Sequence, residues 1–80
     1  MNQTREEKEK DFADFTVSEL KEIISETILT EEDRKIAEYR FIKLFTQDKI
    51  SEKIGLDIRT VQRRLTAIKT KLRKTINKRH

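Results

Sequence analysis

Residues 46–76 read TQDKISEKIGLDIRTVQRRLTAIKTKLRKTI, and this stretch decides the fold that we expect. Thr46 and Asp57 are residue types that favour helix N-termini, and each precedes an amphipathic run. Between the two runs stands Gly55, the only glycine of the chain, which takes a left-handed conformation after a helix end without steric cost. The stretch therefore predicts a short helix at 47–54, a tight turn, and a longer helix at 58–76.

Both predicted helices carry apolar residues at helical spacing. In the longer helix these form one continuous stripe: Val61, Leu65, Ile68, Leu72 and Ile76. Ile50 and Ile54 form the inner face of the shorter helix, Ser51 is small enough for a close helix crossing, and Leu56 fills the corner. The order of cap, short helix, glycine, cap and longer helix is typical of a helix-turn-helix.

The residues upstream predict two further helices. Thr16 and Glu19 have the spacing of a capping box before a helix at 17–28. Its apolar face consists of Leu20, Ile23, Ile24 and Ile28. Thr30, followed by three acids that the helix dipole favours, begins a helix at 31–44. The core that we expect consists of Leu20, Ile24, Ile36, Phe41, Phe45, Ile50, Ile54, Val61, Leu65 and Ile68.

The composition favours an all-α fold. One glycine and no proline leave too few turn residues for an all-β fold of 80 residues. A hydrophobic fraction of 34% against a charged fraction of 42% suits a small bundle of amphipathic helices. We expect a small all-α helical bundle with a long basic last helix. Residues 1–15 should form a flexible or weakly helical segment, and residues 16–80 a single domain.

The residue types that are rare or missing exclude several classes of function. Without cysteine there is no disulfide, thiolate metal site or thiol nucleophile, and His80 is the only histidine. The acids stand in exposed first turns or beside lysines, with no glycine-rich loop to complete an active site. No apolar run reaches the roughly 18 residues of a membrane helix, and no signal peptide is visible. We expect a cytoplasmic protein that is not an enzyme and binds no cofactor, metal, membrane or small-molecule substrate.

Positive charge is concentrated in the last third of the chain. Residues 1–56 hold 10 Lys and Arg against 14 Asp and Glu, whereas residues 57–80 hold nine Lys and Arg against Asp57 alone. A basic segment on a mildly acidic body is the arrangement expected of a nucleic-acid binder. A solvated basic helix without a partner has the same composition, so charge alone leaves both interpretations open.

The run ISEKIGLDIRTVQRRLTAIKTKL (residues 50–72) resembles the C-terminal, region-four DNA-binding domain of bacterial sigma factors, and also LuxR-type domains. The shared pattern is an aliphatic residue, a small residue, an aliphatic–Gly–aliphatic turn, a cap, and a valine four residues after the cap. It is met here by Ile50, Ser51, Ile54, Gly55, Leu56, Asp57 and Val61. The preceding LTEEDRKIAEYRFIKLFTQDKI (residues 29–50) is similar to the sigma pattern as well.

Two positions depart from the family pattern. Leu44 stands where the family usually has glycine, so the helix end before Thr46 must be shaped differently, and Ser51 replaces the commoner alanine. Eighty residues cannot also hold the sigma-factor domain that melts promoter DNA. The resemblance therefore fits best a small stand-alone phage transcription regulator of the ArpU type.

The outer face of the longer helix, opposite its apolar stripe, carries hydrogen-bonding side chains and no acid. Arg pairs with guanine, Gln with adenine, and Thr contacts the thymine methyl group or a phosphate. Because the N-terminal half of a recognition helix points at base edges, we expect base contacts from Arg59, Thr60, Gln62, Arg63 and Thr66. Flanking groups and the N-terminus of the shorter helix should hold phosphates, namely Thr46, Gln47, Arg64, Lys69, Lys71 and Arg73.

These observations predict sequence-specific binding of double-stranded DNA that regulates transcription initiation, in a phage or mobile-element setting. One alternative is a sigma-like module that acts mainly by contact with RNA polymerase or another protein. A second is the DNA-recognition protein of a phage terminase small subunit. RNA polymerase and a second copy of the chain stay open as partners.

Overall fold

In the computed structural model, which describes residue 12 and residues 14–79, every regular element is a helix. In chain order these are α2 (Val17–Glu26), α3 (Glu31–Ala37), the π-helix η1 (Glu38–Ile42), α4 (Gln47–Ile54) and α5 (Ile58–Arg79). The predicted all-α class is confirmed for this part of the chain. The expected flexible or weakly helical state of residues 1–11 lies outside the described residues.

The helices begin where the capping residues stand. Thr16 and Glu19 form the predicted capping box, since each side chain accepts a hydrogen bond from the other's backbone N–H, at 3.1 and 2.8 Å. Thr30 and Thr46 start α3 and α4 by accepting from the N–H three residues on, in both cases at 3.1 Å. Asp57 does the same for α5 at 3.0 Å. Each cap satisfies a backbone donor that the helix itself leaves unpaired.

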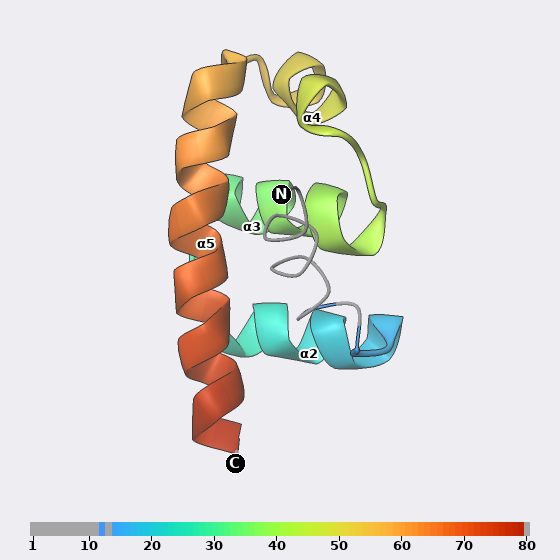
Figure 1. Cartoon of the computed structure of the whole chain (residues 1–80), viewed down its shortest axis with the longest axis vertical. Helices are drawn as coiled ribbons and strands as arrows, with labels where there is room; N and C mark the ends of the chain where they lie inside the picture. The colour runs from blue at the N-terminus through green and yellow to red at the C-terminus, as the bar shows by residue number, and fades with distance from the viewer. Residues whose placement is uncertain (1–11, 13, 80) are drawn as a thin grey trace, which may run out of the picture.

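The long helix α5 runs the whole height of the molecule, and the shorter helices lie along one side of it (Figure 1). The chain climbs from α2 through α3 and η1 to α4, and then returns along α5. All of α2, α3 and α4 contact α5, so the predicted apolar stripe of α5 is the surface on which they meet. At about 1.5 Å per residue, the 22 residues of α5 span roughly 33 Å.

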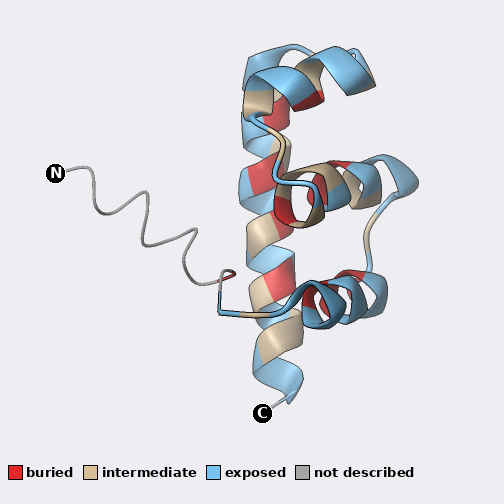
Figure 2. Ribbon diagram, turned by 90° about the vertical axis from the view of Figure 1, so that its right-hand side faces the viewer, coloured by how far each residue is buried: buried red, intermediate tan, exposed pale blue. Residues whose placement is uncertain are grey.

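The core lies between α5 and the three shorter helices, where the buried residues face one another (Figure 2). Eight of the ten predicted core residues are buried, while Phe45 and Ile54 are only half-buried and pack against its margin. The core also contains Ile23, Ala37 and Leu72. Phe12 joins it at 2% exposure, with its ring 5.0 Å from that of Phe41.

The first helix ends earlier than predicted. The Thr27 hydroxyl and N–H both donate to the Ile23 carbonyl, at 2.7 and 3.1 Å, and Thr27 itself is extended. These bonds close α2 at Glu26 and turn the chain outward, so Ile28 is 90% exposed. The prediction that Ile28 belongs to the apolar face of this helix is therefore wrong.

The helix predicted at 31–44 changes type midway and stops at 42. From Glu38 it widens to a π-helix, in which the Lys43 N–H bonds to the Glu38 carbonyl at 3.0 Å. Phe45 N–H then bonds to the Tyr39 carbonyl at 2.8 Å, and the two rings stack 5.3 Å apart. The chain leaves this end through Leu44, whose φ of 60° is left-handed. Leu44 thus adopts, at some steric cost, the conformation that glycine takes without strain.

The turn between α4 and α5 has the predicted form. Gly55 is left-handed, with φ of 84°, and its N–H donates to the Ser51 carbonyl at 2.9 Å. The Ser51 hydroxyl donates across the turn to the Leu56 carbonyl. Serine in place of alanine therefore adds a hydrogen bond that fixes the turn.

Two substitutions at the left-handed residues should change stability in opposite directions. Gly55→Ala should lower the free energy of unfolding by about 1 kcal/mol, because a Cβ there meets no atom within 4 Å and the cost is purely conformational. Leu44→Gly should raise it by up to about 1 kcal/mol, because Leu44 is 76% exposed and loses little packing. Urea denaturation followed by circular dichroism measures both. A destabilised Leu44→Gly variant would contradict the strain assigned to this residue.

Candidate nucleic-acid interface

The outward face of the first three turns of α5 carries the polar side chains that the sequence singled out. Arg59, Gln62, Arg63 and Thr66 are exposed, and Thr60 is half-buried. α5 itself contains no acid, and its only acidic neighbour in the chain is its cap, Asp57. The face therefore combines fixed positive charge with amide and hydroxyl groups.

The N-terminus of α4 lies beside this face. Gln62 Nε2 donates to Gln47 Oε1 at 3.0 Å, which joins the first residue of α4 to the second turn of α5. Thr46, the cap of α4, is exposed just before it. The turn thus brings Gln62, a predicted base contact, against Gln47, a predicted phosphate contact 15 residues earlier in the chain, with Thr46 next to Gln47.

Asp57 links the turn to the same face. Its carboxylate accepts from the Thr60 N–H, and hydrogen bonding to Thr60 is the main reason that the pKa of Asp57 lies below its ordinary value. The positive charge of Arg63 lowers this pKa further. Asp57 therefore stays ionised and caps α5, where its negative charge is favoured by the positive end of the helix dipole.

Three arginines of α5 contact other parts of the molecule: Arg64 and Arg73, which are predicted phosphate contacts, and Arg79. Arg64 Nη1 lies 2.9 Å from both Glu32 and Asp33 of α3, which raises the pKa of its guanidinium. Arg79 bonds Glu26 of α2 through both carboxylate oxygens at 3.0 Å. The Arg73 guanidinium lies 5.7 Å from the centre of the Phe12 ring. These arginines tie α5 to the rest of the bundle.

The threonines of the outward face turn their hydroxyls toward the helix backbone. Thr66 donates to the Gln62 carbonyl at 3.1 Å, and Thr70 donates to the Thr66 carbonyl at 3.2 Å. Their methyl groups and oxygen lone pairs are left to face a ligand. In this state Thr66 can contact a thymine methyl or accept a hydrogen bond, rather than donate one to a phosphate.

The remaining predicted phosphate contacts differ in exposure: Lys71 is exposed, and Lys69 is half-buried. Lys74 and Lys78, which the sequence analysis did not select, are also exposed. They follow Lys71 at three and seven residues, so helical spacing places the three lysines on one side of α5, where they line a pocket together with Glu26 and Thr27. The basic surface of α5 therefore continues to its C-terminal turns.

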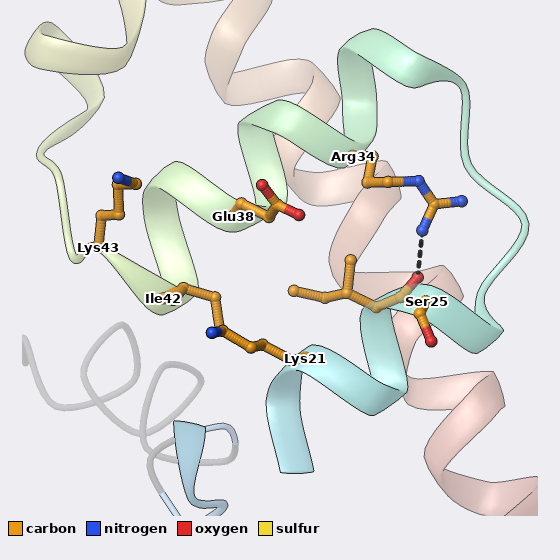
Figure 3. A pocket seen from close by; sticks show the side chains of 7 residues that line it. Lys21, Ser25, Arg34, Glu38, Ile42 and Lys43 are labelled. Atoms are coloured by element: carbon orange, nitrogen blue, oxygen red, sulfur yellow. Dashed lines mark hydrogen bonds between the residues drawn. The ribbon is translucent and has the colours of Figure 1, made fainter. Parts of the chain in front are cut away.

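A cleft of about 560 Å³ lies between α2 and the α3–η1 segment (Figure 3). Ile24 and Ile42 provide apolar lining, and Lys21, Arg34 and Lys43 bring positive charge against the single acid Glu38. One guanidinium nitrogen of Arg34 donates to the Ile24 carbonyl at 2.9 Å. α5 passes behind the cleft in this view, and none of the residues that line the cleft belongs to α5.

Comparison with protein-family models, curated proteins and solved structures finds no match for this chain. Among the described residues, no helix is both long and apolar enough to cross a membrane. Nor does this part of the chain hold a group of three or more His, Cys, Asp or Glu that could bind a metal ion. The interface must therefore be judged on its own geometry.

The cap of α5 should make stability depend on pH. Because folding lowers the pKa of Asp57, its contribution is present above the unfolded value of about 3.9 and is lost as the pH falls through the folded value. Asp57→Asn keeps a capping oxygen but removes the charge. Thermal unfolding should show the wild type more stable than this variant at neutral pH, with the difference in stability disappearing as the pH falls below the unfolded value and through the lower folded one. A difference that is constant over this range would contradict the role given to the carboxylate.

Proposed function

We propose that this chain binds double-stranded DNA with α4, the Gly55 turn and α5 acting as a helix-turn-helix. The observation that carries the proposal is the exposed, acid-free outward face at the start of α5, with the α4 N-terminus held beside it. A major groove admits one α-helix, and the N-terminal half of that helix meets the base edges. The resemblance to sigma region-four and LuxR-type domains supports the same assignment.

In this proposal the base contacts come from exposed residues of the first three turns. Arg59 and Arg63 pair with guanine O6 and N7, Gln62 pairs with adenine, and Thr66 presents its methyl group to thymine. Thr60, half-buried in the first turn, lies at the edge of this set. Sequence preference should then depend on the arginines and on Gln62.

Phosphate contacts position the helix without reading sequence. Thr46 and Gln47 offer the N-terminus of α4 to one strand, where backbone N–H groups and the helix dipole favour an anion. Lys71 reaches another phosphate from an exposed site. Arg64, bound to Glu32 and Asp33, and Arg73, above Phe12, would have to leave these partners to reach a phosphate. Lys69 stays a proposed contact.

The biological role that follows is regulation of transcription initiation, by a regulator of phage or mobile-element type. Occupying an operator, or recruiting polymerase beside it, would be sufficient for such a regulator.

Specific and non-specific contacts should separate in two variants. Arg63→Ala should cost about 1 to 3 kcal/mol on the preferred site and relax the preference at one or two base pairs, because it removes a base contact. Lys71→Ala should weaken binding to all duplexes alike and lower the slope of log affinity against log salt by about one. Site selection from a random library, with titrations at several salt concentrations, measures both effects. Equal behaviour of the two variants would mean that Arg63 reads no base.

The cleft between α2 and η1 favours a second candidate function, contact with a partner protein such as RNA polymerase. Three cations around an apolar lining suit a segment that combines acidic and aliphatic side chains. None of the residues that line the cleft is a proposed DNA contact, so a partner and DNA would use different side chains. This candidate adds to DNA binding rather than replacing it.

Charge reversal in the cleft should separate the two functions. Lys21→Glu should abolish a complex with purified polymerase while leaving the DNA gel shift in place. Lys35→Glu, on an exposed residue of α3 outside the cleft, is the matched control and should keep both. If polymerase binds neither the wild type nor its DNA complex, the second candidate fails and DNA binding alone is left.

A further inference from the structure

The contact between Gln47 and Gln62 pairs two side-chain amides at the proposed DNA surface. Gln62 Nε2 donates to Gln47 Oε1 at 3.0 Å, with Gln62 exposed and Gln47 half-buried. An amide has two N–H donors and one oxygen, so this single bond leaves groups on both side chains unused. The unused groups are one N–H and the oxygen on Gln62, and both N–H donors on Gln47.

The unused groups of Gln62 match one base. Adenine presents an acceptor, N7, beside a donor, N6, on its major-groove edge, and a glutamine amide pairs with both at once. That pairing uses the amide oxygen and the N–H on the same edge. The other N–H, which points away from the oxygen, is the one left for Gln47.

We propose that Gln47 is a positioning residue that holds the amide of Gln62 in the orientation that reads adenine. A free glutamine can rotate its amide and lose the donor–acceptor match, or turn away from the groove altogether. Gln47 Oε1 accepts only from an N–H, so it favours the rotamer in which Gln62 Oε1 points away from it. The inference rests on the proposed DNA binding; within it, Gln62 contacts adenine and Gln47 holds Gln62 in place.

The same arrangement couples base reading to the DNA backbone. Gln47 is the first residue of α4, next to the Thr46 cap, where an anion is favoured. Its own Nε2 donors are therefore available to a phosphate while its oxygen holds Gln62. A phosphate bound there would fix Gln47, and Gln47 would fix Gln62.

The turn makes this coupling rigid. Gly55 N–H and the Ser51 hydroxyl bond across the end of α4, and Asp57 caps α5, so the two helices meet at a fixed register. Ile50 and Val61, both fully buried, pack in the core beneath. The backbones that carry Gln47 and Gln62 are therefore held at a fixed separation, and only their side chains can move.

Four variants test the assignment by selection of bound sites from a random duplex library and by titration of the selected site. Gln62→Ala should remove an adenine preference of about 5- to 150-fold at one position. Gln47→Ala should weaken the same preference although Gln47 touches no base.

Gln47→Glu keeps an oxygen acceptor for Gln62 and places a negative charge at the phosphate, so it should lower affinity and keep the preference. Gln47→Lys keeps a phosphate donor and lacks the acceptor, so it should lose the preference with a smaller loss of affinity than Gln47→Ala.

Asn77→Ala is the matched control, because it removes an exposed amide from α5 far from the turn. It should change neither the preference nor the affinity. Circular dichroism of each variant identifies any that fails to fold. Among the folded variants, the positioning role requires that Gln47→Glu keeps the adenine preference and that Gln47→Lys loses it.

The outcomes separate this inference from the proposed function. A wild type that selects no sequence and shows no salt-dependent binding overturns both. A wild type that selects a site, in which Gln62→Ala removes an adenine and Gln47→Ala leaves that adenine unchanged, overturns only the positioning role. A selected site that is unaffected by Gln62→Ala overturns the adenine assignment and leaves DNA binding in place.

Discussion

Packing of a single apolar stripe on α5 against three short helices is the interaction on which the rest of this structure depends. Val61, Leu65, Ile68 and Leu72 are the buried residues of α5, and each of α2, α3 and α4 contacts this helix. Short helices of seven to ten residues are not stable alone in water, so their order comes from this contact. Because the stripe occupies one side of α5, the opposite side faces solvent.

The position of each arginine around α5 determines whether it pairs with an acid of the shorter helices or stays exposed. Arg64 and Arg79 lie near the edge or the line of the stripe, and both find carboxylates of the shorter helices. Arg59 and Arg63 project from the other side and stay exposed. α5 thus partly neutralises four acids of the body: Glu32 and Asp33 in the first turn of α3, and Glu22 and Glu26 of α2.

Local patterns predicted more of this molecule than tertiary ones did. The caps at Thr16, Thr30, Thr46 and Asp57, the bounds of α4 and the left-handed Gly55 all follow from bonds within a few residues, and all are confirmed. Three other features depend on residues distant in sequence: the π-helix, the burial of Phe12 and the pairing of Arg64 with α3. The helical spacing of apolar residues does not predict them. At the candidate site helical spacing predicted the exposed side of α5 except for Thr60, which is half-buried. It could not show that Gln47 and Gln62 meet, since that contact requires the turn geometry.

The strained end of η1 belongs to the same geometry. Leu44 and Gly55 are the two left-handed residues of the described chain, and they stand just before and just after α4. The first sets the path into Thr46, and the second sets the path into α5. Leu44 is 76% exposed, so its side chain offsets little of the conformational cost that glycine would avoid. The placement of α4, and with it the position of Gln47 against α5, is therefore determined by two backbone turns together with the burial of Ile50.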